Sequence, residues 1–278
     1  PDKKRNIKIA IPLSREKTKS KNAYFSKAQN ISTWDDVLTG TCRINLPYKN
    51  YQYLYNCAVR SVVLHSAKQV YPGPFTYKRF WFRDAVFIIY SLLKIGLIKR
   101  SERLIDGFLS KQTVLGYFHS QQGEWDSNGQ VLWLMNKFAR ITASEPKAKW
   151  LKSAVNAANW IIRKKTVTSS GKTHAGLLPA GFSAEHLGPS DFYYWDDFWS
   201  VAGLQAAEKM TRNTKYEKKK LQFQSHADDL TSAIEKSLEK CRKRLGSDAI
   251  PASPYRRLDS GAIACLVASD PLELLSPK

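Results

Sequence analysis

Cysteine is scarce in this sequence, and its spacing excludes the commonest cysteine-built sites. Cys42, Cys57, Cys241 and Cys265 are the only four among 278 residues, and no two of them form a CxxC pair. Such spacing predicts neither a zinc site nor a disulfide framework. The basic start, PDKKRNIK, is not followed by the apolar core of a signal peptide. We therefore expect reduced thiols, a cytoplasmic location and no metal or other cofactor; a signal peptide upstream of Pro1 stays open as the alternative.

Long apolar runs are absent as well. The longest, AVFIIYSLLKIGLIKR, is interrupted by Lys94, Lys99 and Arg100, whereas a membrane-spanning helix needs about 18 uncharged residues. Hydrophobic residues nevertheless make up 43% of the chain, which is enough for a sizeable core. We expect a soluble globular protein with no membrane partner.

Acidic residues are outnumbered by basic ones, 24 to 44, which gives a net charge of +20. Such a charge is typical of proteins that bind nucleic acids or anionic surfaces. The basic residues concentrate in the N-terminal segment, in IIRKKT, and from KYEKKK to EKCRKRL. The last two stretches have amphipathic helical spacing, which favours a solvated helix face. We therefore expect no nucleic-acid partner.

The chain beyond its first residues has the periodicity of helices. Residues 1–45 carry many charges and little periodicity, and we interpret them as a linker or the tail of an upstream domain. In residues 46–278, amphipathic segments alternate with segments that are apolar around most of their circumference. The amphipathic segments are 49–67, 101–113, 146–164 and 214–244, and the apolar ones are 84–96, 129–141, 197–210 and 259–268. This alternation predicts helical hairpins with one solvent-facing helix and one inner helix each.

Unusual residues gather in the loops that lead into the inner helices. These loops are YKRFWFRDA, GEWDSNG, FYYWDDFW and YRRLDSG, and each carries an Asp near the start of a helix. If the inner helices run the same way, the four loops meet at one end of the domain. Aspartate is also a good N-cap, contributing ~1 kcal/mol, so capping alone explains any one of them.

The neighbours of these aspartates favour a binding site. Arg83 stands at a helix start, where the helix dipole disfavours a cation, and Trp81, Trp125 and Trp195 lie within a few residues of an Asp. Aromatic faces combined with carboxylates and a guanidinium suit a sugar ring, which has apolar C–H faces and a rim of hydroxyls.

Three motifs resemble those of a known family. WFRDA at 81–85, EWDSNGQVLW at 124–133 and YWDDFWSVAGLQAA at 194–207 resemble the sugar-binding and acid motifs of the six-hairpin (α/α)6 toroid glycosidases. The glucoamylase and glucodextranase group is the most similar, and trehalases and glycogen-debranching glucosidases are relatives. The resemblance covers roughly residues 49–270. It implies an all-α toroid of which this chain holds about four of six hairpins.

The resemblance also implies an activity and roles for residues. It implies a glycoside hydrolase, inverting, that acts on an α-glucan or related oligosaccharide or polysaccharide. The family's acid is a Glu that follows a Trp, which places the general acid at Asp196; trehalases have Asp there. The implied substrate-binding residues are Trp81, Arg83, Asp84, Trp125, Asp126, Trp195 and Asp197.

Asp196 and Asp197 cannot themselves be an acid and base pair. An inverting mechanism needs two carboxyl groups about 6.5–9.5 Å apart on opposite faces of the sugar. Like charge and an aromatic shell would instead raise the pKa of the acid. We find no convincing base after Asp259, because Asp270 and Glu273 have the pattern of loop or cap residues. The family keeps its base in the last hairpins, which we expect to be missing here.

Two other functions remain open, and three residues are further candidates. A sugar phosphorylase on a similar toroid would use phosphate in place of water and base. A non-catalytic helical protein could bind carbohydrate or an anionic polymer. Asn128, Glu185 and His186 are additional candidates from the same loops, and the segment 166–194 is expected to fold over the rim of the pocket.

Overall fold

The computed structural model describes residues 33–182 and 189–275, and the chain divides into two units, Pro1–Thr41 and Cys42–Lys278. The described part of the first unit contains one short helix, α2 (Trp34–Val37). A capping box starts it: the Thr33 hydroxyl accepts a hydrogen bond from the Asp36 amide, and the Asp36 carboxylate accepts one from the Thr33 amide. The interpretation of residues 1–45 as a linker or the tail of an upstream domain stays a prediction.

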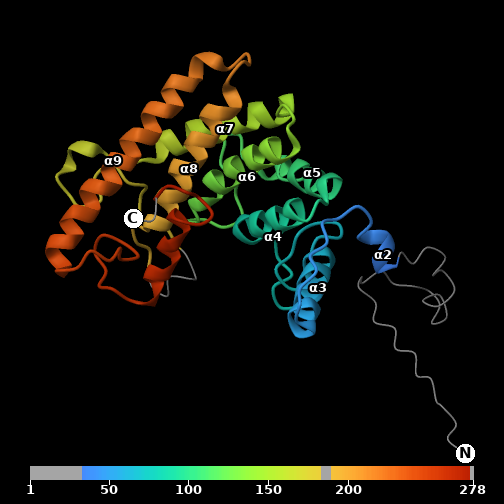
Figure 1. The fold of residues 1–278 in the computed structure, drawn as a ribbon. Helices are drawn as coiled ribbons and strands as arrows, with labels where there is room; N and C mark the ends of the chain where they lie inside the picture. The colour runs from blue at the N-terminus through green and yellow to red at the C-terminus, as the bar shows by residue number, and fades with distance from the viewer. Residues whose placement is uncertain (1–32, 183–188, 276–278) are drawn as a thin grey trace, which may run out of the picture. The chain divides into compact units, whose positions relative to one another are not determined.

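The regular structure in the described part of the second unit is helical, which confirms the all-α prediction (Figure 1). Its pairing between extended segments is limited there to two isolated bridges, Gln112 with Phe118 and Gly181 with Asp191. No helix within residues 33–182 and 189–275 combines the length and apolar character needed to cross a bilayer. The elements are α3 (Lys49–Leu64), α4 (Phe82–Lys94), α5 (Ile98–Asp106), η1 (Leu109–Lys111), α6 (Asp126–Thr142), α7 (Ala148–Lys164), η2 (Thr168–Ser170), α8 (Tyr194–Thr211), η4 (Glu217–Lys219), α9 (Lys220–Leu245) and η5 (Ser260–Ala268).

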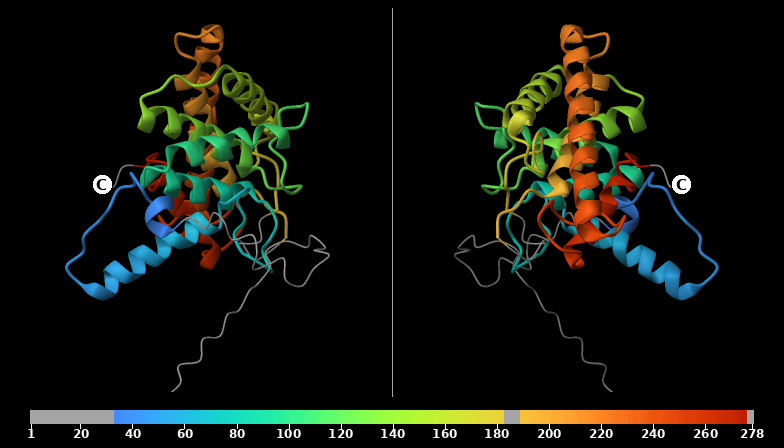
Figure 2. Two further views of the ribbon diagram at one scale, coloured as in Figure 1. Left: turned by 90° about the vertical axis from the view of Figure 1, so that its right-hand side faces the viewer. Right: turned by 90° about the vertical axis from the view of Figure 1, so that its left-hand side faces the viewer.

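The apolar helices form an inner row, as their composition predicts. Helix α4 packs on α6, and α6 packs on α8. The amphipathic helices lie outside this row: α5 packs on α4, α7 on α6 and α8, and α9 on α8 (Figure 1). Helix α3 extends away from the other helices of this unit (Figure 2), and Val63 is its only buried residue.

Two glycines allow the closest contact in this row. A Cβ atom on Gly129 of α6 would lie 2.1 Å from the Trp199 carbonyl oxygen of α8, and one on Gly203 would lie 2.6 Å from the Gly129 Cα. Only residues without a side chain permit backbones to approach this closely. The starts of α6 and α8 are thereby held next to each other.

The fourth apolar segment was predicted as a buried α-helix, and this prediction is wrong. Residues 260–268 form the 3₁₀ helix η5. It packs on α8 along one side, burying Cys265 and Val267, while Ile263 and Leu266 are 72% and 65% exposed. A 3₁₀ helix has three residues per turn, so this short segment buries a different set of positions from an α-helix.

Candidate functional site

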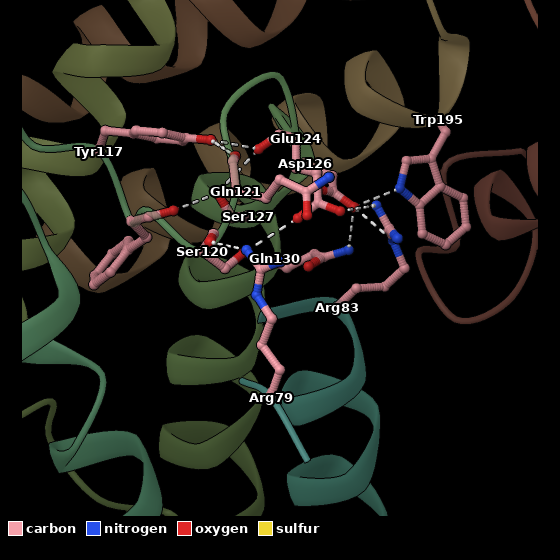
Figure 3. A network of polar contacts seen from close by, with 11 residues as sticks. Arg79, Arg83, Tyr117, Ser120, Gln121, Glu124, Asp126, Ser127, Gln130 and Trp195 are labelled. Atoms are coloured by element: carbon pink, nitrogen blue, oxygen red, sulfur yellow. Dashed lines mark hydrogen bonds and ion pairs between the residues drawn. The ribbon is translucent and has the colours of Figure 1, made fainter. Parts of the chain in front are cut away.

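Three motifs that are distant in sequence meet at one carboxylate oxygen, Oδ2 of Asp126 (Figure 3). It accepts hydrogen bonds from Arg83 Nε at 3.0 Å, Trp195 Nε1 at 2.7 Å and Gln130 Nε2 at 2.9 Å. Arg83 lies in the first turn of α4, Asp126 begins α6, and Trp195 is the second residue of α8. The starts of three inner helices therefore lie together, as predicted for these three of the four loops.

A second carboxylate, Glu124, joins this network. It is 5% exposed, its Oε1 lies 3.8 Å from Arg83 Nη2, and its Oε2 accepts a hydrogen bond from the Ser120 hydroxyl. No role was predicted for Glu124 or Gln130, although both lie in the motif EWDSNGQVLW. The i, i+4 spacing of Asp126 and Gln130 on one helix was a usable signal.

Asp196, the predicted acid, is buried at the edge of this network and is 2% exposed. No residue of the described segments hydrogen-bonds its carboxyl group. Burial raises the pKa of Asp196 well above its ordinary value, and the negative charges of Asp126, Asp197 and Glu124 raise it further, while Arg83 opposes them. A carboxyl in this setting keeps its proton at a pH where an exposed one has lost it.

Asp197 faces a different part of the structure, and the capping role we considered for it is wrong. Its Oδ1 accepts a hydrogen bond from the Leu178 amide at 2.8 Å, and its Oδ2 is buried with no partner in the described residues. Tyr193, the N-cap of α8, makes no side-chain cap. Burial raises the pKa of Asp197 to about 8. Asp197 thus fixes the segment that precedes α8.

Trp125, predicted to bind substrate, lies in the core. It is 5% exposed, and its Nε1 donates to the Ala180 carbonyl at 3.2 Å. Its ring lies against Trp160 and Tyr117, with the Lys164 Nζ 3.9 Å from its centre. Aromatic residues of these loops can therefore belong to the core, as Trp125 does.

The remaining predicted residues of the first motif flank Arg83. Trp81 is the N-cap residue of α4 and is half-buried, with the Arg79 guanidinium 5.1 Å from its ring centre. Asp84 lies half-buried in the first turn of α4. The Arg83 guanidinium lies 5.8 Å from the ring centre of Trp195.

Asn128 has a structural role. It is fully buried, its Oδ1 accepts from the Phe118 amide at 2.7 Å, and its Nδ2 donates to the carbonyls of Gly116 and Ala157. Asn128 therefore holds the loop before α6 in place. Glu185 and His186, the other additional candidates, lie outside the described residues.

The segment before α8 runs beside the helix starts. Besides the contact of Leu178 with Asp197, the Phe182 amide donates to the Gly123 carbonyl at 2.8 Å, next to Glu124. The described parts of the segment 166–194 thus lie along the loops that form the network. Its expected position over a pocket rim stays a prediction.

The fourth loop, YRRLDSG, contributes a helix cap. The segment just before it reaches the start of α8, where the Tyr194 amide donates to the Ala252 carbonyl at 3.1 Å. Asp259 accepts from the Gly261 amide at 2.9 Å and pairs with Arg256 at 2.9 Å. The capping explanation therefore holds for Asp259.

The described part of the chain contains no group of three or more His, Cys, Asp or Glu residues arranged to hold a metal ion. This region combines a buried carboxyl of raised pKa, Asp196, with a hydrogen-bonded carboxylate, a guanidinium and an indole. No protein-family model, curated protein or solved structure matches the chain.

Proposed function

We propose that this protein is a glycoside hydrolase in which Asp196 is the general acid. The observation that carries the proposal is the setting of Asp196, a buried carboxyl with a raised pKa beside the Asp126 network. A general acid must be protonated at the working pH and must lie where the leaving group binds. Burial and the nearby carboxylates of Asp126 and Glu124 supply the first condition.

The neighbouring side chains suit the recognition of a sugar. Trp195 is half-buried and offers an aromatic face, while Arg83 and Asp126 offer a donor and an acceptor for hydroxyl groups. Glu124 and Asp126 are both held by hydrogen bonds from neighbouring side chains. This favours a binding role for them over the activation of water, and the proposal assigns no general base among the described residues.

The packing of the helices supports the proposed relationship to toroid glycosidases. Inner helices α4, α6 and α8 follow one another, and outer helices α5, α7 and α9 lie against them. Such a row of helical hairpins with shared N-terminal loops is what part of an (α/α)6 toroid would present. An α-glucan or related glycoside is the proposed substrate class.

Turnover of Asp196 variants tests this proposal. Asp196→Asn keeps the size of the side chain and removes the proton, so hydrolysis of an α-glucan oligosaccharide should fall by roughly two to four orders of magnitude. The loss should be smaller for a glycosyl fluoride, whose leaving group needs little protonation. The matched control, Asp197→Asn, retains an acceptor for the Leu178 amide and should keep turnover within about tenfold.

Two results would contradict the assignment. If Asp197→Asn abolishes turnover and Asp196→Asn spares it, the two roles are reversed. If neither substitution affects the hydrolysis of any glycoside that the wild-type protein cleaves, Asp196 is not the acid.

A further inference from the structure

A groove of about 1140 Å³ lies between the segment 165–176 and helix α9, away from the residues of the Asp126 network. Its lining is rich in charge. Three carboxylates line it, from Asp229, Glu235 and Glu239, and six basic side chains do so as well. The basic residues are Lys165, Lys172, Lys236, Lys240, Arg242 and Lys243.

Three of these basic side chains already contact a carboxylate or carbonyl oxygen. Arg242 and Lys243 both pair with Glu239, at 2.6 and 3.5 Å. The Lys240 ammonium donates to the carbonyl oxygens of Gly171 and Lys172. No carboxylate of the described segments lies within ion-pair distance of the other three, Lys165, Lys172 and Lys236. The groove therefore presents more positive charge than its own acidic residues balance.

Lys165 and His226 form a close pair of basic groups in the groove. The Lys165 Nζ lies 3.3 Å from the His226 Nδ1, and both side chains are half-buried. Asp229, at 3.6 Å from Nδ1, is the carboxylate that faces this pair. Burial lowers the pKa of Lys165, and burial together with Lys165 lowers the pKa of His226. Two adjacent, partly desolvated basic groups would be stabilised by a bound anion.

We propose that this groove is a binding site for a phosphate dianion, with Lys165 and His226 as its principal charged donors. The hydroxyl-bearing residues Thr168 and Ser232 also line the groove and can donate to phosphate oxygens. Two charges and several acceptor oxygens match paired basic groups better than a single carboxylate does. The size of the groove admits a phosphorylated small molecule as well as the free ion. This site is independent of the proposed hydrolase activity.

The imidazole of His226 provides the readout. The pKa of His226 is measured by NMR in sodium phosphate and in sodium chloride of equal ionic strength. A dianion bound beside the ring favours its charged form, so phosphate should raise the pKa of His226 by about 1 unit. The imidazole of His65, which does not line the groove, is the internal reference and should titrate alike in both salts.

Lys165→Met retains most of the aliphatic stem and removes the charge, so it should abolish the effect of phosphate on His226. The control Lys99→Met removes an exposed lysine that does not line the groove and should leave the effect intact. An equal pKa of His226 in the two salts, in the wild-type protein, would overturn the proposal without any variant. An unchanged response in folded Lys165→Met would overturn it as well.

A second titration distinguishes the sources of the phosphate. If glucose 6-phosphate produces the same shift of His226 at a lower concentration than inorganic phosphate, the site binds a phosphorylated sugar. If the two act at equal concentrations, it binds the phosphate group alone, and both results support the site.

Discussion

The indole Nε1 of Trp195 lies 2.7 Å from Oδ2 of Asp126 and donates a hydrogen bond to it. This bond joins two motifs whose residues are 69 positions apart in the sequence. Arg83 donates to the same atom from a third helix (Figure 3). Hydrogen bonds to a charged group contribute about 1.5–3 kcal/mol each. This oxygen therefore fixes the relative positions of three helix starts and places a negative charge close to Asp196.

The charges of Asp126 and Arg83 should shift the pKa of the proposed acid, Asp196, in opposite directions. Asp126 raises the pKa of Asp196 and Arg83 lowers it. An acid is active while protonated, so activity falls as pH rises through its pKa. Asp126→Asn should therefore move the alkaline limb of the pH profile of kcat/KM to lower pH, and Arg83→Gln should move it to higher pH. Assays on a glycosyl fluoride, which depend less on the acid, serve as the control.

Shifts of the same sign in both variants would contradict this electrostatic account. Substitutions that only loosen the network would lower kcat/KM without moving the alkaline limb. A direct check is the titration of the Asp196 carboxyl carbon by NMR in both variants.

The close contact between α6 and α8 predicts that one added methyl group strongly lowers the stability of the fold. Gly129→Ala would place a Cβ 2.1 Å from the Trp199 carbonyl oxygen, so the helices must separate. The free energy of unfolding, measured with urea, should fall by at least about 2 kcal/mol. In Gly246→Ala the Cβ meets open space, and only the positive φ of +63° opposes it. Gly246→Ala should lower the free energy of unfolding by about 1 kcal/mol. An equal loss in both variants would contradict a close contact between the backbones of α6 and α8.

The helices and the meeting of three motifs could be predicted from the sequence because periodicity determines which face is buried. Segments 49–67, 146–164 and 129–141 correspond to α3, α7 and α6. Because inner and outer helices alternate along the chain, the loops that lead into the inner helices were predicted to meet at one end of the domain. The identity of the Oδ2 donors could not be predicted, because rotamers of Arg83 and Gln130 depend on packing across helices.

The errors have physical causes as well. Trp125 and Asp126 are neighbours whose side chains enter different environments, the aromatic core and the polar network, and adjacency in sequence conceals this. The partner of Asp197 is a backbone amide 19 residues earlier, and no local pattern encodes such a contact. The segment 259–268 has apolar residues at positions compatible with several helix types, so its 3₁₀ geometry depends on how it packs against α8.

The buried carboxyl of Asp197 should make the stability of the fold depend on pH in a defined direction. Burial raises its pKa to about 8 in the folded protein, whereas an unfolded Asp titrates near 3.9. Between these values the folded state binds the proton and the unfolded state does not. The free energy of unfolding should therefore fall as pH rises from about 4 to about 8, by up to ~1.4 kcal/mol per pH unit from this group.

Asp197→Asn removes this titration and retains an acceptor for the Leu178 amide, so the decline of stability should become shallower. Asp196 titrates in the same direction, so some decline remains. Urea unfolding at several pH values between 4 and 8 measures the difference. The control Asp228→Asn removes an exposed carboxylate of α9 and should leave the wild-type slope. Parallel curves for wild-type protein and Asp197→Asn would mean that Asp197 is already ionised in the folded state, and its contact with Leu178 would then be a charge-assisted hydrogen bond.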